Sequence, residues 1–340
     1  MTDVLDWDGI VREAKNRRAK EGLTQLKHAQ LAGVSRDTIR SFDKYERSIS
    51  LEKAIAILRV VGLVSDVERL RYGAREQADF VRRGLDRWNE LVRPLPKDHP
   101  SRFPHGRITH DFQLQGEWAP IDGSTLLKLL ANISGISGWS PFHVFSKQLL
   151  QPTIEVDDEI ECWVGRPSED KVFADASYAD YWRASPHGNF LLLRGYQEDG
   201  EESQEPGMFL DIALPLWRAA DVLEHARSIA EHFPKGVERV ILHVTWDGLA
   251  GRRLVNWSRP TAMFATRSEH RSRAPSVTNA VTVDGGANDA SSLHSLLLPL
   301  YAAFDFDLRE EDVSNELLRR KSKGRGIISS SANTDTLVDR

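Results

Sequence analysis

Apolar residues recur at helical spacing through residues 7–63, in short runs separated by signals that end one helix and begin the next. In the last run, Leu51, Ile55 and Leu58 fall on one face of a helix, as expected for a side that packs on a core. Residues with side-chain oxygens stand where helices would begin: Thr24, Ser35 and Ser50. The pattern predicts a compact unit of four or five short helices, two of them joined by a tight turn at Gly33.

A longer apolar repeat follows at residues 65–93. Its members recur at three- and four-residue steps: Val67, Leu70, Ala74, Ala78, Val81, Leu85, Trp88 and Leu91. This spacing predicts a helix about 40 Å long. The apolar side either forms a dimerisation seam or packs on its own chain. The segment 94–106 carries four prolines, which predicts a semi-rigid linker.

Beyond the prolines, residues 107–318 alternate strand-like and helical runs and predict a mixed α+β domain. The expected strands are 159–165, 189–196, 208–214, 239–246 and 276–283. The expected helices are 122–134, 215–233 and 291–304. The last segment, 319–340, is polar and rich in small residues, which predicts a disordered tail. The chain is therefore expected to be multidomain, with an all-α domain at 1–64, a long linking helix and a C-terminal α+β domain.

Composition limits the classes of protein to consider. The formal net charge is −5, with 40% hydrophobic and 28% charged residues, which is ordinary for a globular protein and leaves room for a local basic surface. No run of 18 apolar residues occurs, and the N-terminus has no apolar signal core, so we expect no membrane span and a cytoplasmic location near the nucleoid. The single cysteine, Cys162, excludes an internal disulfide and a multi-cysteine zinc site.

The run GLTQLKHAQLAGVSRDTIRSFDKYERSISLEKAIAILRVVGL, residues 22–63, resembles the lambda-repressor-like, or XRE-family, helix-turn-helix proteins. Together with the first helix, the resemblance covers residues 7–63. It rests on Gly22-Leu23-Thr24-Gln25, Ala29, Gly33-Val34-Ser35, Thr38-Ile39, Ser50-Leu51 and Gly62-Leu63. It implies a DNA-binding domain of a transcription regulator. Two positions depart from the family pattern: His28 replaces a leucine, and Tyr45 replaces the glycine that ends the recognition helix.

The predicted recognition helix has an inner apolar side and an outer polar side. The inner side carries Val34, Ile39 and Phe42, and the outer side carries Arg36, Asp37, Arg40 and Ser41. Each arginine suits the O6 and N7 acceptors of a guanine in the major groove. Asp37 suits a cytosine amino group, or it pairs with a neighbouring arginine within the helix.

Four further residues are expected to hold the DNA backbone. The resemblance implies that Gln25, at the start of the second helix, binds a phosphate, which the helix dipole favours. The basic candidates for phosphate contacts are Lys27, Lys44 and Arg47. Such contacts give affinity and salt dependence rather than base specificity.

No catalytic or cofactor motif is present. The sequence lacks a phosphate-binding loop, a nucleophile elbow and a zinc-protease helix, so we expect no enzyme, no cofactor and no metal. His105, His110 and Asp111 suggest a metal site only weakly, and a polar loop is the simpler interpretation. His225 and His232 lack a carboxylate or cysteine to complete a site.

Tryptophan and arginine gather in three runs of the C-terminal domain. The patterns W-R-x-S-P, L-R-G-Y-Q-E-D, P-x-W-R and G-L-x-G-R, within residues 181–255, resemble the accessory region of bacterial Schlafen/AlbA-2-type proteins. Guanidinium groups beside rings suit a small anionic or planar ligand. The candidates are Arg183, Arg194, Arg218, Arg252, Trp182, Trp217 and Trp246. In the alternative interpretation, the arginines pair with acids and the tryptophans fill the core.

These features predict a sequence-specific regulator, a dimeric repressor that binds double-stranded DNA at a palindromic operator. Its C-terminal domain is expected to sense a small anionic ligand or a protein partner. Two alternatives remain open from the sequence. One is an effector or nucleic-acid-acting enzyme, for example in phage defence, that uses the helix-turn-helix for targeting. The other is an antitoxin-like protein-binding module.

Overall fold

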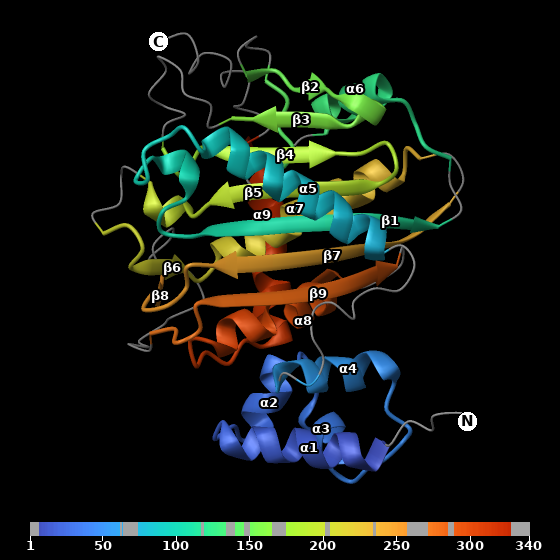
Figure 1. Cartoon of the computed structure of the whole chain (residues 1–340), viewed down its shortest axis with the longest axis vertical. Helices are drawn as coiled ribbons and strands as arrows, with labels where there is room; N and C mark the ends of the chain where they lie inside the picture. The colour runs from blue at the N-terminus through green and yellow to red at the C-terminus, as the bar shows by residue number, and fades with distance from the viewer. Residues whose placement is uncertain are drawn as a thin grey trace.

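The computed structural model has an N-terminal helical domain below a larger domain built on a sheet (Figure 1). The predicted multidomain layout, helix-turn-helix followed by mixed helix and sheet, is confirmed. The structure describes residues 7–61, 63, 74–116, 119–133, 140–145, 150–164, 175–200, 205–233, 236–256, 271–284 and 289–327. None of the described helices is both long and apolar enough to cross a membrane.

The described residues of the N-terminal domain form four helices. They are α1 (Trp7–Lys20), α2 (Gln25–Leu31), α3 (Arg36–Asp43) and α4 (Leu51–Val60). Each of the last three begins at the predicted cap, where the side-chain oxygen of Thr24, Ser35 or Ser50 accepts a backbone N–H three residues later. Gly33 turns the chain between α2 and α3 with a φ of 63°, a conformation that glycine adopts without strain.

The core of this domain explains the first departure from the family pattern. Val11, Ile39, Phe42 and Ile57 are fully buried together. His28 is buried beside them, and its Nε2 lies 2.9 Å from the carbonyl oxygen of Ile57. Burial lowers the pKa of His28, which keeps the ring neutral. A histidine therefore fills the leucine position by linking α2 to α4.

The larger domain is built on a mostly buried antiparallel sheet with the strand order β2-β3-β4-β5-β1-β7-β9. The strands are β1 (Arg107–Gly116), β2 (Thr153–Ile154), β3 (Ile160–Trp163), β4 (Asp180–Ala184), β5 (Asn189–Gly195), β7 (Val237–Asp247) and β9 (Ser276–Asp284). A separate parallel pair joins β6 (Phe209–Asp211) to β8 (Arg253–Val255). β1 lies between β5 and β7, so the first strand in the chain is central in the sheet.

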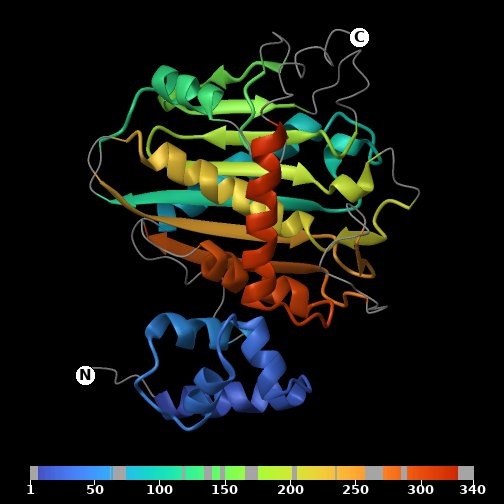
Figure 2. The same ribbon diagram turned by 180° about the vertical axis from the view of Figure 1, so that it is seen from behind.

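Helices cover both faces of the sheet. α5 (Ala74–Val92) lies on one face (Figure 1), while α7 (Leu214–Ala230), α8 (Asp289–Ala302) and α9 (Glu310–Ile327) lie on the other (Figure 2). The main core lies under the second group and includes leucines of α6 (Gly123–Asn132). Side chains of each strand alternate between these two faces.

All five predicted strand regions contain strands of the structure, but β1, β2, β4 and β8 were not predicted. In β1, Ile108, Phe112 and Leu114 point to the main core while polar residues alternate with them. The interspersed histidine, aspartate and glutamines obscured this period in the sequence. β4 is buried at every position, so it shows no alternation at all.

The apolar side of α5 packs on the sheet of its own chain, which is the alternative left open by the repeat. Phe80, Trp88 and Val92 are at most 5% exposed and contact the outer face of β4 and β5 at Tyr181, Leu191 and Leu193. The packed side largely agrees with the predicted one, because Trp88 is buried and Val81, Leu85 and Leu91 pack against the same cluster. It differs at Ala78, which is exposed, whereas Gln77 and Gly84 are buried. The apolar side of residues 74–92 is therefore covered by the sheet of its own chain, while dimerisation itself stays a prediction; residues 64–73 lie outside the described residues.

Two further segments differ from the sequence-based expectation. The proposed linker 94–106 is packed: the guanidinium of Arg102 donates to the carbonyls of Val92 and Leu95, and the ring of Phe103 stacks on Trp88. α9 runs to Ile327, so residues 319–327 of the predicted tail are helical, with acidic residues at the helix start that suit its dipole. Residues 328–340 lie outside the described residues.

Gly84 lies where α5 packs closely on Leu191 of β5. A Cβ atom at residue 84 would lie 2.3 Å from Leu191 Cδ2. We predict that Gly84→Leu lowers the unfolding free energy by about 3 kcal/mol, because the core of α5 and β5 is already filled. Urea unfolding followed by circular dichroism measures this change. A leucine there would strengthen a coiled-coil seam, so a stabilised variant would contradict the packing of α5 on the sheet.

Candidate DNA-binding surface and the arginine clusters

The outer side of α3 presents the predicted base-reading residues. Arg36, Asp37 and Arg40 are exposed, and Ser41 is partly exposed. Arg40 donates to Asp37 at 3.1 Å, but the pair is 51% and 87% exposed. An exposed pair of this kind contributes roughly 0–1 kcal/mol, so it does not prevent Arg40 from binding a base edge. Lys44 and Arg47 continue the exposed basic surface beyond the end of α3.

Gln25 is fixed by a contact that the sequence did not reveal. Its side-chain amide donates to Asp43 Oδ2 at 2.6 Å, at the far end of α3. The same carboxylate takes two hydrogen bonds from the guanidinium of Arg18, at 2.7 and 2.9 Å. This link orients α2 relative to α3, with Gln25 in the first turn of α2. Arg18 and Asp43 are 25 residues apart, and no local signal in the sequence pairs them.

Lys27 differs from the expectation. It was predicted to contact a DNA phosphate, but its ammonium donates to Asp305 at 2.8 Å and to the carbonyl oxygen of Ala302. Ala302 ends α8, where the negative end of the helix dipole attracts a cation. Lys27 therefore binds the C-terminal domain in this structure.

Tyr45 adopts the backbone conformation of the glycine that it replaces. Its φ is 64°, in the left-handed region that costs an L-residue roughly 1–2 kcal/mol. Trp7 donates its indole N–H to the Tyr45 carbonyl, and the ammonium of Lys15 lies 5.2 Å from the centre of the Tyr45 ring. These contacts with α1 hold the turn, so α3 ends at Asp43 without a glycine.

The backbone at Tyr45 can be tested with two variants that both remove the ring. We predict that Tyr45→Val destabilises the N-terminal domain by about 1–2 kcal/mol more than Tyr45→Asn, because asparagine tolerates positive φ and a β-branched residue does not. Hydrogen exchange of the α3 and α4 amides measures the difference. Equal exchange in the two variants would show that the backbone conformation does not limit stability here.

The seven arginine and tryptophan candidates do not form one pocket. Trp182 and Arg183 are neighbours on β4, so their side chains lie on opposite faces of the sheet. Trp182 and Trp246 are buried in the main core, and the Trp217 indole donates to Glu316 of α9 at 2.8 Å. The arrangement separates the rings from Arg183 and gives them packing roles.

The arginines on the core side have acceptors within the chain. Arg194 makes a bidentate pair with Asp180 across β5 and β4, at 2.5 and 2.8 Å. Arg218 donates to the side-chain oxygen of Gln197 at 3.0 Å. Arg252 is fully buried, and all five of its N–H groups donate to acceptors: the Asp199 carboxylate and the carbonyls of His105, Phe209 and Gly248. Each of these side chains joins segments that are distant in sequence.

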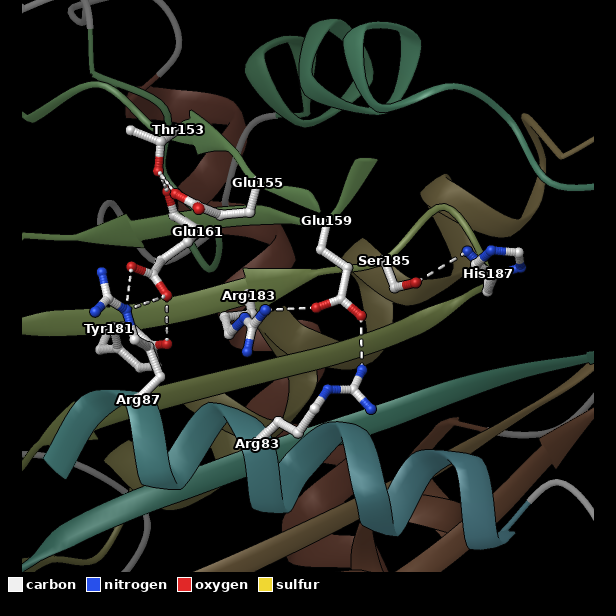
Figure 3. Close-up of polar contacts among 10 residues, drawn as sticks. All are labelled: Arg83, Arg87, Thr153, Glu155, Glu159, Glu161, Tyr181, Arg183, Ser185 and His187. Atoms are coloured by element: carbon white, nitrogen blue, oxygen red, sulfur yellow. Dashed lines mark hydrogen bonds and ion pairs between the residues drawn. The ribbon is translucent and has the colours of Figure 1, made fainter. Parts of the chain in front are cut away.

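Arg183 lies in an open cleft of about 490 Å³ between α5 and the strands β3 and β4. The lining residues are Arg83, Arg87, Arg183, Glu155, Asp157, Glu159 and Glu161. Figure 3 shows Glu159 between Arg83 and Arg183, at 2.7 and 2.5 Å, and Glu161 bound by Arg87 and by the Tyr181 hydroxyl. Three guanidinium groups therefore face four carboxylates. The surplus of carboxylates disfavours binding of a small anionic ligand. The ion pairs of Arg83 and Arg87 connect α5 to the sheet.

The candidate metal ligands do not come together. His110 points to the core side of β1 and Asp111 to the opposite side, where it accepts from Gln77. His225 is buried in α7, whereas His232 is exposed beyond the end of that helix. Among the described residues, no cluster of three potential ligands is present.

Two buried histidines stay neutral in the folded C-terminal domain. Burial lowers the pKa of His110 to about 3, and the nearby cations Arg194 and Arg218 add to this effect. Burial also lowers the pKa of His225 to about 4. In the unfolded chain these histidines become protonated below the ordinary histidine pKa of about 6.5. In the folded state they stay neutral at the same pH.

We predict that stability falls as the pH drops from about 6.5 towards 4, because only the unfolded state then becomes protonated at these histidines. Between pH 6.5 and 5, each histidine would cost about 2 kcal/mol. Urea unfolding followed by tryptophan fluorescence measures this loss. His110→Gln should reduce the loss by about that amount, whereas His232→Gln, at an exposed site, serves as the control. An unchanged pH profile in His110→Gln would contradict the assignment.

Comparison with known proteins agrees with the geometry of the N-terminal domain. Residues 15–68 match the family model described as helix-turn-helix. This span contains α2, α3, α4 and the end of α1 from residue 15, so the predicted helix-turn-helix DNA-binding domain is confirmed. No curated protein and no solved structure matches the chain. The resemblance of residues 181–255 to Schlafen/AlbA-2-type proteins is not confirmed and stays a prediction.

Proposed function

We propose that this chain is a sequence-specific transcription regulator that reads the major groove with α3 and represses the promoters it occupies. The observation that carries this proposal is the exposed basic side of α3 within a segment that matches the helix-turn-helix family model. Arg36 and Arg40 are one turn apart, and Arg36 is the first residue of α3. Side chains in the N-terminal part of a recognition helix are those that reach base edges.

We infer that two copies bind an inverted repeat. α3 is eight residues long, and only three or four side chains of such a helix contact bases. One copy would therefore read a few base pairs. A second copy placed about 34 Å away along the duplex would double that number. In this proposal α5 does not join the copies, because its apolar side is covered by the sheet.

The C-terminal domain is proposed to act as a sensor rather than as an enzyme. The contact between Lys27 of α2 and the end of α8 connects this domain directly to the DNA-binding unit. A ligand or protein partner that moves α8 would change this contact and thereby the position of α2. The charge balance of the cleft beside α5 disfavours a small anion as the ligand bound there.

The recognition helix can be tested on duplexes selected from a random DNA library by the full-length protein. We predict that the double variant Arg36→Ala/Arg40→Ala binds the selected duplex at least about tenfold more weakly, since each base contact contributes about 1–3 kcal/mol. Fluorescence anisotropy at fixed salt measures the affinity. The matched control is Arg12→Ala/Arg82→Ala, which removes two exposed arginines outside α3.

Equal affinities of the two double variants would show that α3 does not read the DNA. The selected sequences also test the number of bound copies, because two copies predict an inverted repeat. Selection of no common sequence would instead favour an effector that uses the helix-turn-helix only to reach DNA.

A further inference from the structure

We propose that Lys27 has two alternative partners, the acceptor pair at the end of α8 and a DNA phosphate, so that the docked C-terminal domain weakens DNA binding. This inference rests on the proposed DNA-binding function. It names the contact through which the C-terminal domain would regulate the helix-turn-helix.

The two domains meet along α2 and the second half of α8. Lys27, in the first turn of α2, contacts residues 302–305, and Gly33, beyond the end of α2, lies beside the carbonyl of Ser295. α2 therefore runs antiparallel to α8. Figure 1 places α2 on the side of the N-terminal domain that faces the sheet domain. Asn279 of β9 supports this surface by donating to the carbonyls of Ser295 and Leu296.

The end of α8 presents oxygen acceptors and negative charge to the first turn of α2, as a DNA phosphate would. The Ala302 carbonyl lies at the negative end of the helix dipole, and the Asp305 carboxylate adds a full charge. Asp305 has a φ of 53°, and its N–H donates to the same Ala302 carbonyl. This turn orients both acceptors towards Lys27, so one ammonium donates to the carbonyl and to the carboxylate.

The same ammonium is one of the basic groups that the sequence predicts to contact a DNA phosphate. Lys27 belongs to the helix-turn-helix segment that matches the family model, and it is the basic side chain of the first turn of α2. An ammonium paired with Asp305 cannot at the same time neutralise a phosphate. DNA binding must therefore either forgo this contact or break the pair.

The strength of the pair suits a contact that exchanges. The Lys27 side chain is 27% exposed and that of Asp305 is 60% exposed. A partly exposed pair of this kind contributes up to about 1 kcal/mol, which corresponds to about a fivefold change in affinity. Such a pair restrains binding without abolishing it.

The test is Asp305→Asn in the full-length protein, because asparagine keeps the left-handed turn and removes the charge. We expect this variant to bind the selected duplex about twofold to fivefold more tightly than the wild type. The matched control is Asp307→Asn, at an exposed residue with no ion pair to Lys27 among the described residues. Its affinity should stay within about 1.5-fold of the wild type, because salt screens an exposed charge.

A double-mutant cycle with Lys27→Ala isolates the exchange. Lys27→Ala should weaken binding more in the Asp305→Asn background than in the wild type, because only there has the ammonium lost its charged partner in α8's terminal turn. Equal effects in both backgrounds, or equal gains in the Asp305 and Asp307 variants, would overturn the inference. If Asp305→Asn has no effect while Arg36→Ala/Arg40→Ala still weakens binding, the inference fails and the proposed function stands. If the α3 variant binds normally, the proposed function fails first.

Discussion

The buried side chain of Arg252 is the constraint on which much of the C-terminal domain depends. Its guanidinium joins the end of the proline-rich segment, the short helical turn after β5, the start of β6 and the turn before β8, through one carboxylate and three carbonyls. A buried guanidinium is tolerated only when every donor has an acceptor. Loss of the Asp199 carboxylate would leave an unpaired charge in the core, at a cost of roughly 3–5 kcal/mol. The four segments are therefore held in one arrangement.

Similar pairs repeat this principle elsewhere in the domain. Arg194 joins β5 to β4 through Asp180, and Arg320 of α9 binds Asp221 of α7. Each pair crosses between elements rather than within one. In the sequence, the arginine motifs suggested a ligand. In the structure, their arginines form the ion pairs and hydrogen bonds that connect strands, helices and loops. A pattern of arginine beside tryptophan is compatible with either use, and the partners decide between them.

The parts that the sequence predicted correctly are those governed by local rules. The caps at Thr24, Ser35 and Ser50 and the turn at Gly33 depend on neighbours within a few residues, so they were predicted and are present. The exposed side of α3 followed from the same helical period. The partners of Lys27 and of α5 lie roughly 275 and 110 residues away along the chain, and no local pattern encodes them. The strand β4 was not predicted, because burial on both faces removes the alternation of apolar and polar residues that identifies a strand.

The packing of α5 on β4 and β5 has a consequence for how fragments of this chain behave. A fragment cut after α5 would carry Phe80, Trp88 and Val92 without Leu191 and Leu193 to cover them. Exposed apolar stripes of this size drive self-association or aggregation. Such a fragment would form oligomers through a surface that the intact chain hides, and its DNA affinity would be raised by that association. A cut before α5 would instead keep α1 to α4 together with the buried cluster that they share.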